Sequence, residues 1–113
     1  MAFALSQTTV GDHIAVISLE GELDATVAGQ LRDAVDQAAS VGQARRLVLD
    51  MTELTFMASA GLRALVFARQ KMGSGVEIFV VGANEGVLET IEMTGFQHSV
   101  TLLDTYDAAQ IES

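Results

Sequence analysis

The sequence contains no cysteine, few aromatic residues and few basic residues. The absence of cysteine excludes disulfides, thiolate catalysis, and zinc or iron–sulfur sites with cysteine ligands. The two histidines, His13 and His98, lie far apart in the sequence, and neither has a neighbour that suggests a catalytic triad. Few side chains are therefore available for catalysis, and we do not expect an enzyme.

Acidic residues outnumber basic ones, since 15 Asp and Glu against six Lys and Arg give a net charge of −9. This charge repels phosphate backbones and anionic lipid surfaces, so we expect no nucleic-acid partner. No apolar segment reaches the roughly 18 residues that a membrane-spanning helix needs. The segment Met1–Val10 also lacks a basic region followed by a long apolar stretch. We therefore expect a soluble, cytoplasmic protein without direct membrane insertion.

The spacing of apolar residues predicts alternating strands and helices. Half of the 113 residues are apolar but only 5% are aromatic, which predicts one domain with an aliphatic core. The expected strands are Phe3–Thr9, Ile14–Leu19, Leu47–Leu49, Val76–Val81 and Val100–Leu103. The expected helices cover about residues 25–39, 59–72 and 85–93, with a last one from Tyr106. This order indicates an α/β fold with a mixed, mostly parallel sheet, an antiparallel edge and about four helices.

Ser59 stands between the loop predicted to follow Asp50 and the helix predicted over residues 59–72. In α/β proteins the carboxyl ends of parallel strands, and the helix starts that follow them, commonly hold ligands. The first turn of a helix has unpaired N–H donors and partial positive charge, so a serine there can cap the helix or carry a phosphate. Both interpretations stay open, and Arg63, one turn later, is either a partner contact or a solvated side chain.

Other motifs do not reach the pattern that their chemistry requires. The segment Gly82–Gly86 lacks a complete glycine-rich nucleotide-binding motif, so we predict a turn with a helix cap. Ser59 lies outside a Gly-x-Ser-x-Gly motif because Met57 occupies the first glycine position, which argues against a hydrolase. We expect no metal site and no cofactor, because the acidic residues in this part of the chain match no EF-hand spacing: Glu20, Glu22, Asp24 and Asp50. Asp24 is a candidate cap for the first helix.

Three stretches of the sequence resemble the STAS domain family, and within it the anti-sigma factor antagonists. They are Leu19–Asp24, Leu47–Thr52 and Phe56–Leu62. The resemblance implies a single STAS domain over about residues 3–110. In the last stretch the family usually has Asp-Ser-Ser/Thr-Gly-Leu with the first serine phosphorylated, and Ser59 matches that serine. Two alanines depart from the pattern, since Ala58 replaces the aspartate and Ala60 replaces the second hydroxyl residue.

The resemblance implies a phosphorylation-regulated protein that switches partners. Such a protein binds an anti-sigma factor, which is a serine kinase of the histidine-kinase-like ATPase type, and thereby releases a sigma factor. A PP2C-type phosphatase is a further partner of this kind of switch. The candidate phosphoacceptor is Ser59. The candidate partner-binding residues are Glu22, Asp24, Thr55, Met57, Ala58, Ser59, Ala60, Gly61 and Arg63.

Two other functions stay open at this point. Some STAS proteins of this size are structural subunits of lipid-transport or signalling complexes, and Ala58 and Ala60 leave room for such a role without phosphorylation. The segment from Asp50 to Ser59 is also a place where a small ligand or nucleotide would bind, although no phosphate-binding motif is complete there.

Overall fold

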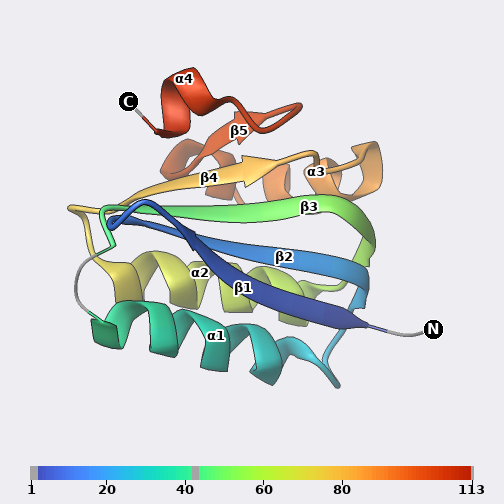
Figure 1. Ribbon diagram of the computed structural model, residues 1–113. Coiled ribbons are helices and arrows are strands. Elements are labelled where there is room, and N and C mark those ends of the chain that lie inside the picture. Colours follow the sequence, from blue (N-terminus) through green and yellow to red (C-terminus); the bar gives the residue numbers. More distant parts are fainter. Residues whose placement is uncertain (1–2, 42–43, 113) are drawn as a thin grey trace.

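The fold is a five-stranded sheet with helices packed on both faces (Figure 1). The computed structural model describes residues 3–41 and 44–112. Its elements, in chain order, are β1 (Ala4–Val10), β2 (Ile14–Leu23), α1 (Ala28–Val41), β3 (Arg46–Met57), α2 (Ser59–Met72), β4 (Glu77–Val81), α3 (Glu85–Glu92), the 3₁₀ helix η1 (Phe96–Ser99), β5 (Thr101–Leu103) and α4 (Ala108–Ile111).

The strands lie side by side in the order β1-β2-β3-β4-β5. The turn at Gly11 joins β1 and β2 as an antiparallel pair, and the other three pairs are parallel. Each parallel connection contains a helix: α1 after β2, α2 after β3 and α3 after β4. The predicted single α/β domain, with a mostly parallel sheet and an antiparallel edge, is confirmed.

The main core lies between the sheet and the layer of α1, α2 and α3. Leu31, Leu65 and Ile91 represent these three helices among its buried side chains. A smaller cluster lies on the opposite face, where Ile111 of α4 is buried against Val16, Val48, Phe79 and Val81. Figure 1 shows α4 on the side of the sheet opposite α1 and α2. Because α4 is short, polar residues occupy the rest of this face.

Strands β2 and β3 are longer than the sequence predicts. Because their apolar runs stop there, we predicted that these strands end at Leu19 and Leu49. The strands continue to Leu23 and Met57. The extensions carry polar residues, which a solvent-facing side of a sheet accepts, and the pairing of β2 with β3 shifts register twice, each time with one extra residue on β3. Apolar alternation therefore ends before the strands do. The loop predicted to follow Asp50 is wrong, because β3 continues as a strand to Met57.

Helix α2 has the predicted bounds, and it ends at Gly73, where a φ of 83° favours glycine. Helix α1 begins at residue 28 rather than 25, because residues 25–27 form a turn. Helix α3 ends one residue earlier and α4 begins two residues later than predicted. The prediction missed η1, which contains the exposed His98. None of the helices among the described residues is long and apolar enough to cross a membrane.

Candidate functional site

The carboxyl ends of β2 and β3 lie side by side at one end of the sheet, and α2 begins there. Leu23 and Met57, the last residues of the two strands, are paired in the parallel register. The N–H of Ala58 then donates to the carbonyl of Leu23, with an N···O distance of 2.9 Å. The chain enters α2 at the next residue, Ser59. This geometry brings the candidate partner-binding residues to one end of the sheet.

Ser59 is the first residue of α2, and it is exposed. The N-cap residue is Ala58, which has an extended backbone (φ −82°, ψ 168°) and a methyl group that cannot accept a hydrogen bond. Within residues 3–41 and 44–112, the Ser59 hydroxyl has no hydrogen-bond partner. The capping role considered for Ser59 is therefore wrong, because the serine lies one position inside the helix.

The start of α2 presents free hydrogen-bond donors. The carbonyl of Ala58 accepts from the N–H groups of Gly61 (2.9 Å) and Leu62 (3.2 Å). The preceding N–H groups, of Ser59 and Ala60, donate to no residue in the described part of the chain. Free donors in a first helical turn carry partial positive charge. An anionic group attached to the Ser59 oxygen would therefore meet a favourable local field.

Two of the candidate partner-binding residues, Met57 and Gly61, are buried. The Met57 side chain is 3% exposed and belongs to the main core. A Cβ on Gly61 would lie 2.8 Å from the Cγ of Leu23 and 3.0 Å from the Cγ of Met57, so glycine is required for this close approach. These residues position α2 from inside and offer no side chain to a partner. Ala60 is also partly buried against the same core.

Glu22 and Asp24 are partly exposed at the end of β2. The Oδ1 atom of Asp24 accepts hydrogen bonds from the Thr26 hydroxyl (2.6 Å) and the Thr26 N–H (3.0 Å). These bonds stabilise the carboxylate and lower the pKa of Asp24 below its ordinary value. The carbonyl of Asp24 also accepts from the N–H of Ala28, at 3.0 Å. Asp24 therefore caps the turn that leads into α1. It lies three residues before the N-cap position of α1, so it is not a cap of the helix itself.

Side-chain hydrogen bonds hold the end of β3 in place. The Thr55 hydroxyl donates to the carbonyl of Gly21 on β2, at 2.9 Å. On the other side of β3, Nδ2 of Asn84 donates to the carbonyl of Leu54 at 3.2 Å, while its Oδ1 accepts a backbone N–H of the first turn of α3. The segment Gly82–Gly86 is thus the predicted turn with a helix cap. Asn84 additionally ties α3 to β3 beside the site.

Phe56 is a surface residue of the site that the sequence did not single out. It is 50% exposed, although it is a large apolar residue, and its Cα is paired with that of Glu22. Arg63 is also exposed, one turn into α2. The missed signal is the spacing of Leu54 and Met57, which are both buried and three residues apart. Regular alternation fails between them, so Phe56 is left on the surface.

Comparison with known proteins agrees with this fold. A profile of the STAS domain family matches residues 6–109. The chain belongs to the STAS domain family. This STAS domain is 30% identical over 99 residues to the anti-sigma-F factor antagonist RsfB of Mycobacterium tuberculosis, in two strains, and the match covers 86% of this chain and 80% of RsfB.

Solved structures share the fold of this STAS domain at lower identity. An anti-sigma factor antagonist from Mycobacterium paratuberculosis superposes with a TM-score of 0.88 at 23% identity, covering 99% of this chain and 96% of that chain. The Bacillus cell fate determinant SpoIIAA in its phosphorylated form superposes with a TM-score of 0.76 at 18% identity, covering 96% and 97%. These likenesses establish the fold alone.

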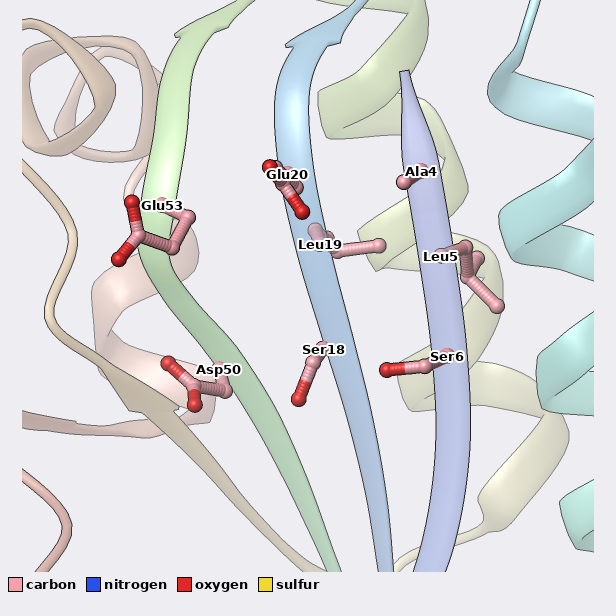
Figure 2. Close-up of a pocket in the computed structure, with 8 residues that line it drawn as sticks. All are labelled: Ala4, Leu5, Ser6, Ser18, Leu19, Glu20, Asp50 and Glu53. Carbon is pink, nitrogen blue, oxygen red and sulfur yellow. The ribbon is translucent and has the colours of Figure 1, made fainter.

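The face of the sheet that α4 leaves uncovered carries several acids of the STAS domain. Figure 2 shows the side chains of Glu20 on β2 and of Asp50 and Glu53 on β3, which line a pocket together with Ser6 and Ser18. Across residues 3–41 and 44–112, no group of three or more His, Asp or Glu side chains is placed to hold a metal ion. This acidic face is formed by the sheet itself and lies apart from the start of α2.

Proposed function

We propose that this STAS domain is an anti-sigma factor antagonist, a binding protein without enzymatic activity, and that it contacts an anti-sigma factor through the surface around Ser59. The observation that carries the proposal is the exposed Ser59, unbonded in the described part of the chain, at the first position of α2. It occurs in a chain that is 30% identical to an anti-sigma-F factor antagonist over most of both proteins.

The proposed contact surface combines apolar, polar and charged side chains. Its exposed members are Thr55, Phe56, Ser59 and Arg63, and its partly exposed members are Glu22, Asp24, Ala58 and Ala60. Exposed aromatic side chains and arginines are residue types enriched in protein interfaces. Met57 and Gly61 take part indirectly, because they hold α2 against the sheet.

The regulation that we propose is phosphorylation of Ser59 by the bound anti-sigma factor, acting as a serine kinase of the histidine-kinase-like ATPase type. A phosphoryl group adds about −1.5 to −2 charges and three acceptor oxygens. In the free domain the unpaired N–H groups of Ser59 and Ala60 would stabilise it. In a complex the same group must be desolvated or repelled, and a penalty of about 3 kcal/mol would lower the affinity on the order of a hundredfold.

The departures at Ala58 and Ala60 are compatible with this switch. An aspartate at position 58 would occupy the N-cap position, where it would accept hydrogen bonds from the first turn and place a negative charge beside the phosphate. Ala58 leaves those donors free. Dephosphorylation by a PP2C-type phosphatase would restore binding and release the sigma factor again.

The experiment is affinity capture from lysate of the native organism with four forms of the full chain: wild type, Ser59→Ala, Ser59→Glu and Ser74→Glu. Ser74 is exposed just beyond the far end of α2, so Ser74→Glu is matched in chemistry and charge. The retained kinase is then purified, its affinity for each form is measured by titration calorimetry, and phosphate transfer from ATP is located by mass spectrometry.

We expect wild type, Ser59→Ala and Ser74→Glu to capture the anti-sigma kinase. We expect Ser59→Glu to bind this kinase on the order of a hundredfold more weakly. Phosphate should appear on Ser59 and be absent from Ser59→Ala. Equal affinity of Ser59→Glu and Ser74→Glu for the kinase would contradict the phosphoswitch and leave the binding function standing. Retention of a transport or signalling complex in place of an anti-sigma factor would contradict the binding function itself.

A further inference from the structure

Strand β1 forms one edge of the sheet, and its outer side is open. All seven residues of Ala4–Val10 pair with β2 without a register shift, and no described strand lies on the other side (Figure 1). Five of the seven residues are exposed. An edge strand of this kind presents a row of unpaired N–H and C=O groups to solvent, which is a template for another strand.

β1 lacks the features that usually protect an edge strand from pairing. Its sequence, Ala-Leu-Ser-Gln-Thr-Thr-Val, contains no charged residue and no proline, and its pairing with β2 contains no bulge. The opposite edge, β5, is only three residues long and is followed by Asp104. Shortness and a nearby charge protect β5, so the open edge of this sheet is β1.

The groove on the α1 side of β1 is uncharged, although the whole chain has a net charge of −9 and the pocket on the other face of the strand contains Glu20, Asp50 and Glu53. The groove between β1 and α1 is lined by uncharged residues, among them Gln7, Gln37 and Ala38. Gln7 also donates from Nε2 to the carbonyl of Ala34 at 2.9 Å, which fixes α1 beside the strand. Two molecules of an acidic protein can meet at such a surface without direct repulsion between like charges.

We infer that β1 pairs with β1 of a second copy of this chain, so that the two sheets become continuous across a two-fold axis. A two-fold contact is self-complementary, and it pairs the strands antiparallel. Centring the pair on Gln7 places Ser6 opposite Thr8 of the second copy and uses every residue of the strand. The edge offers no charged or aromatic side chain for selecting a foreign peptide, whereas a second copy needs only this backbone pairing.

The contact uses β1 and α1, whereas the proposed anti-sigma surface uses the ends of β2 and β3 and the start of α2. The two inferences are therefore independent.

The test is sedimentation equilibrium of the full chain over a wide concentration range, with two double variants at the same two positions of β1. Ser6→Lys with Thr8→Lys sets lysine against lysine at both symmetric pairs. Ser6→Lys with Thr8→Glu sets lysine against glutamate at the same pairs. The matched control is Ser74→Lys with Thr105→Lys, which makes the same charge change at two exposed positions away from β1.

Wild type and the control should show a reversible monomer–dimer equilibrium. The lysine pair should raise the dimer dissociation constant by at least about tenfold, since like charges directly across a strand pair are destabilising, and the lysine–glutamate pair should keep the dimer. A wild type that stays monomeric, or a lysine pair that dimerises like wild type, would overturn the inference. If a variant unfolds, amide hydrogen exchange on the wild type gives an independent test. The outward N–H groups of β1 should gain protection as the protein concentration rises and the dimer forms. Equal exchange at all concentrations would contradict the inference.

Discussion

The backbone of Gly61 lies so close to Leu23 that a Cβ on the glycine would stand 2.8 Å from the leucine Cγ. This contact joins the first turn of α2 to the last residue of β2. The position of Ser59, two residues earlier, therefore depends on core packing as well as on the helix. A change at Gly61 moves the site without touching any of its exposed side chains.

We predict that Gly61→Ala lowers the free energy of unfolding, measured by urea denaturation. Overpacking costs about 1–3 kcal/mol, which exceeds the gain of about 1 kcal/mol from the better helix propensity of alanine. The matched control is Gly29→Ala, near the start of α1, where a Cβ would meet nothing within 4 Å. That control should be neutral or slightly stabilising. Equal stability of the two variants would show that α2 does not need the close approach.

A second prediction compares a capping residue, Asn84, with Ser59, whose hydroxyl makes no hydrogen bond within the described residues. Ser59→Ala should change the free energy of unfolding by less than about 0.5 kcal/mol, because its hydroxyl bonds to no described residue. Asn84→Ala should cost about 1–2 kcal/mol, because Asn84 caps α3 and donates to the carbonyl of Leu54. Thermal and urea unfolding of both variants provides the measurement. A loss above that range for Ser59→Ala would mean that the hydroxyl has a structural role.

Arg69 gives the third prediction. Its guanidinium donates to the carbonyls of Gly73, Val76 (2.5 Å) and Ser99 (3.3 Å), and so ties the end of α2 to the start of β4 and to η1. The single ammonium group of a lysine cannot donate hydrogen bonds to all three carbonyls in this geometry. Arg69→Lys should therefore cost about 1–3 kcal/mol in unfolding free energy, while Arg63→Lys, at an exposed position, should be neutral. Similar midpoints for the two variants would refute the bridging role.

Local patterns predicted the order of the elements, because buried faces repeat with the period of a helix or strand. Helix α2 is the clearest case, since its apolar stripe stops at Gly73 and the bounds are the predicted ones. The prediction ended β3 at Leu49 because the strand continues with residues that need no burial on one face. Helix η1 was missed because a single 3₁₀ turn carries no periodic pattern.

The site was predictable where it follows from chain order, and unpredictable where it depends on distant contacts. Ser59 was found because a strand end and a helix start frame it in the sequence. The bond from Thr55 to Gly21 joins residues 34 positions apart, so no local pattern indicates it. The spacing of Leu54 and Met57 signals locally that Phe56 is exposed, but the register shift beside Phe56 is a property of β2 and β3 together, so no local pattern indicates it.

The last prediction concerns Tyr106, the only tyrosine in a chain without tryptophan. Its hydroxyl donates to Oε2 of Glu112 at 2.6 Å. Tyr106 is 39% exposed, and partial desolvation, then the hydrogen bond and the charge of Glu112, raise the pKa of Tyr106 to about 12. Because this pKa is above that of the unfolded chain, about 10, the stabilisation is fully present below pH 10 or so and is lost as the pH rises through about 12.

Spectroscopic titration of the tyrosinate tests this directly, since one residue gives the whole signal. Glu112→Gln should lower the pKa of Tyr106 only part of the way to its ordinary value, because the negative charge is removed while the partial desolvation of the hydroxyl remains. Glu89→Gln makes the same charge change at an exposed position on α3, and it should leave the titration unchanged. Equal shifts in the two variants would assign the effect to net charge rather than to the contact between Tyr106 and Glu112.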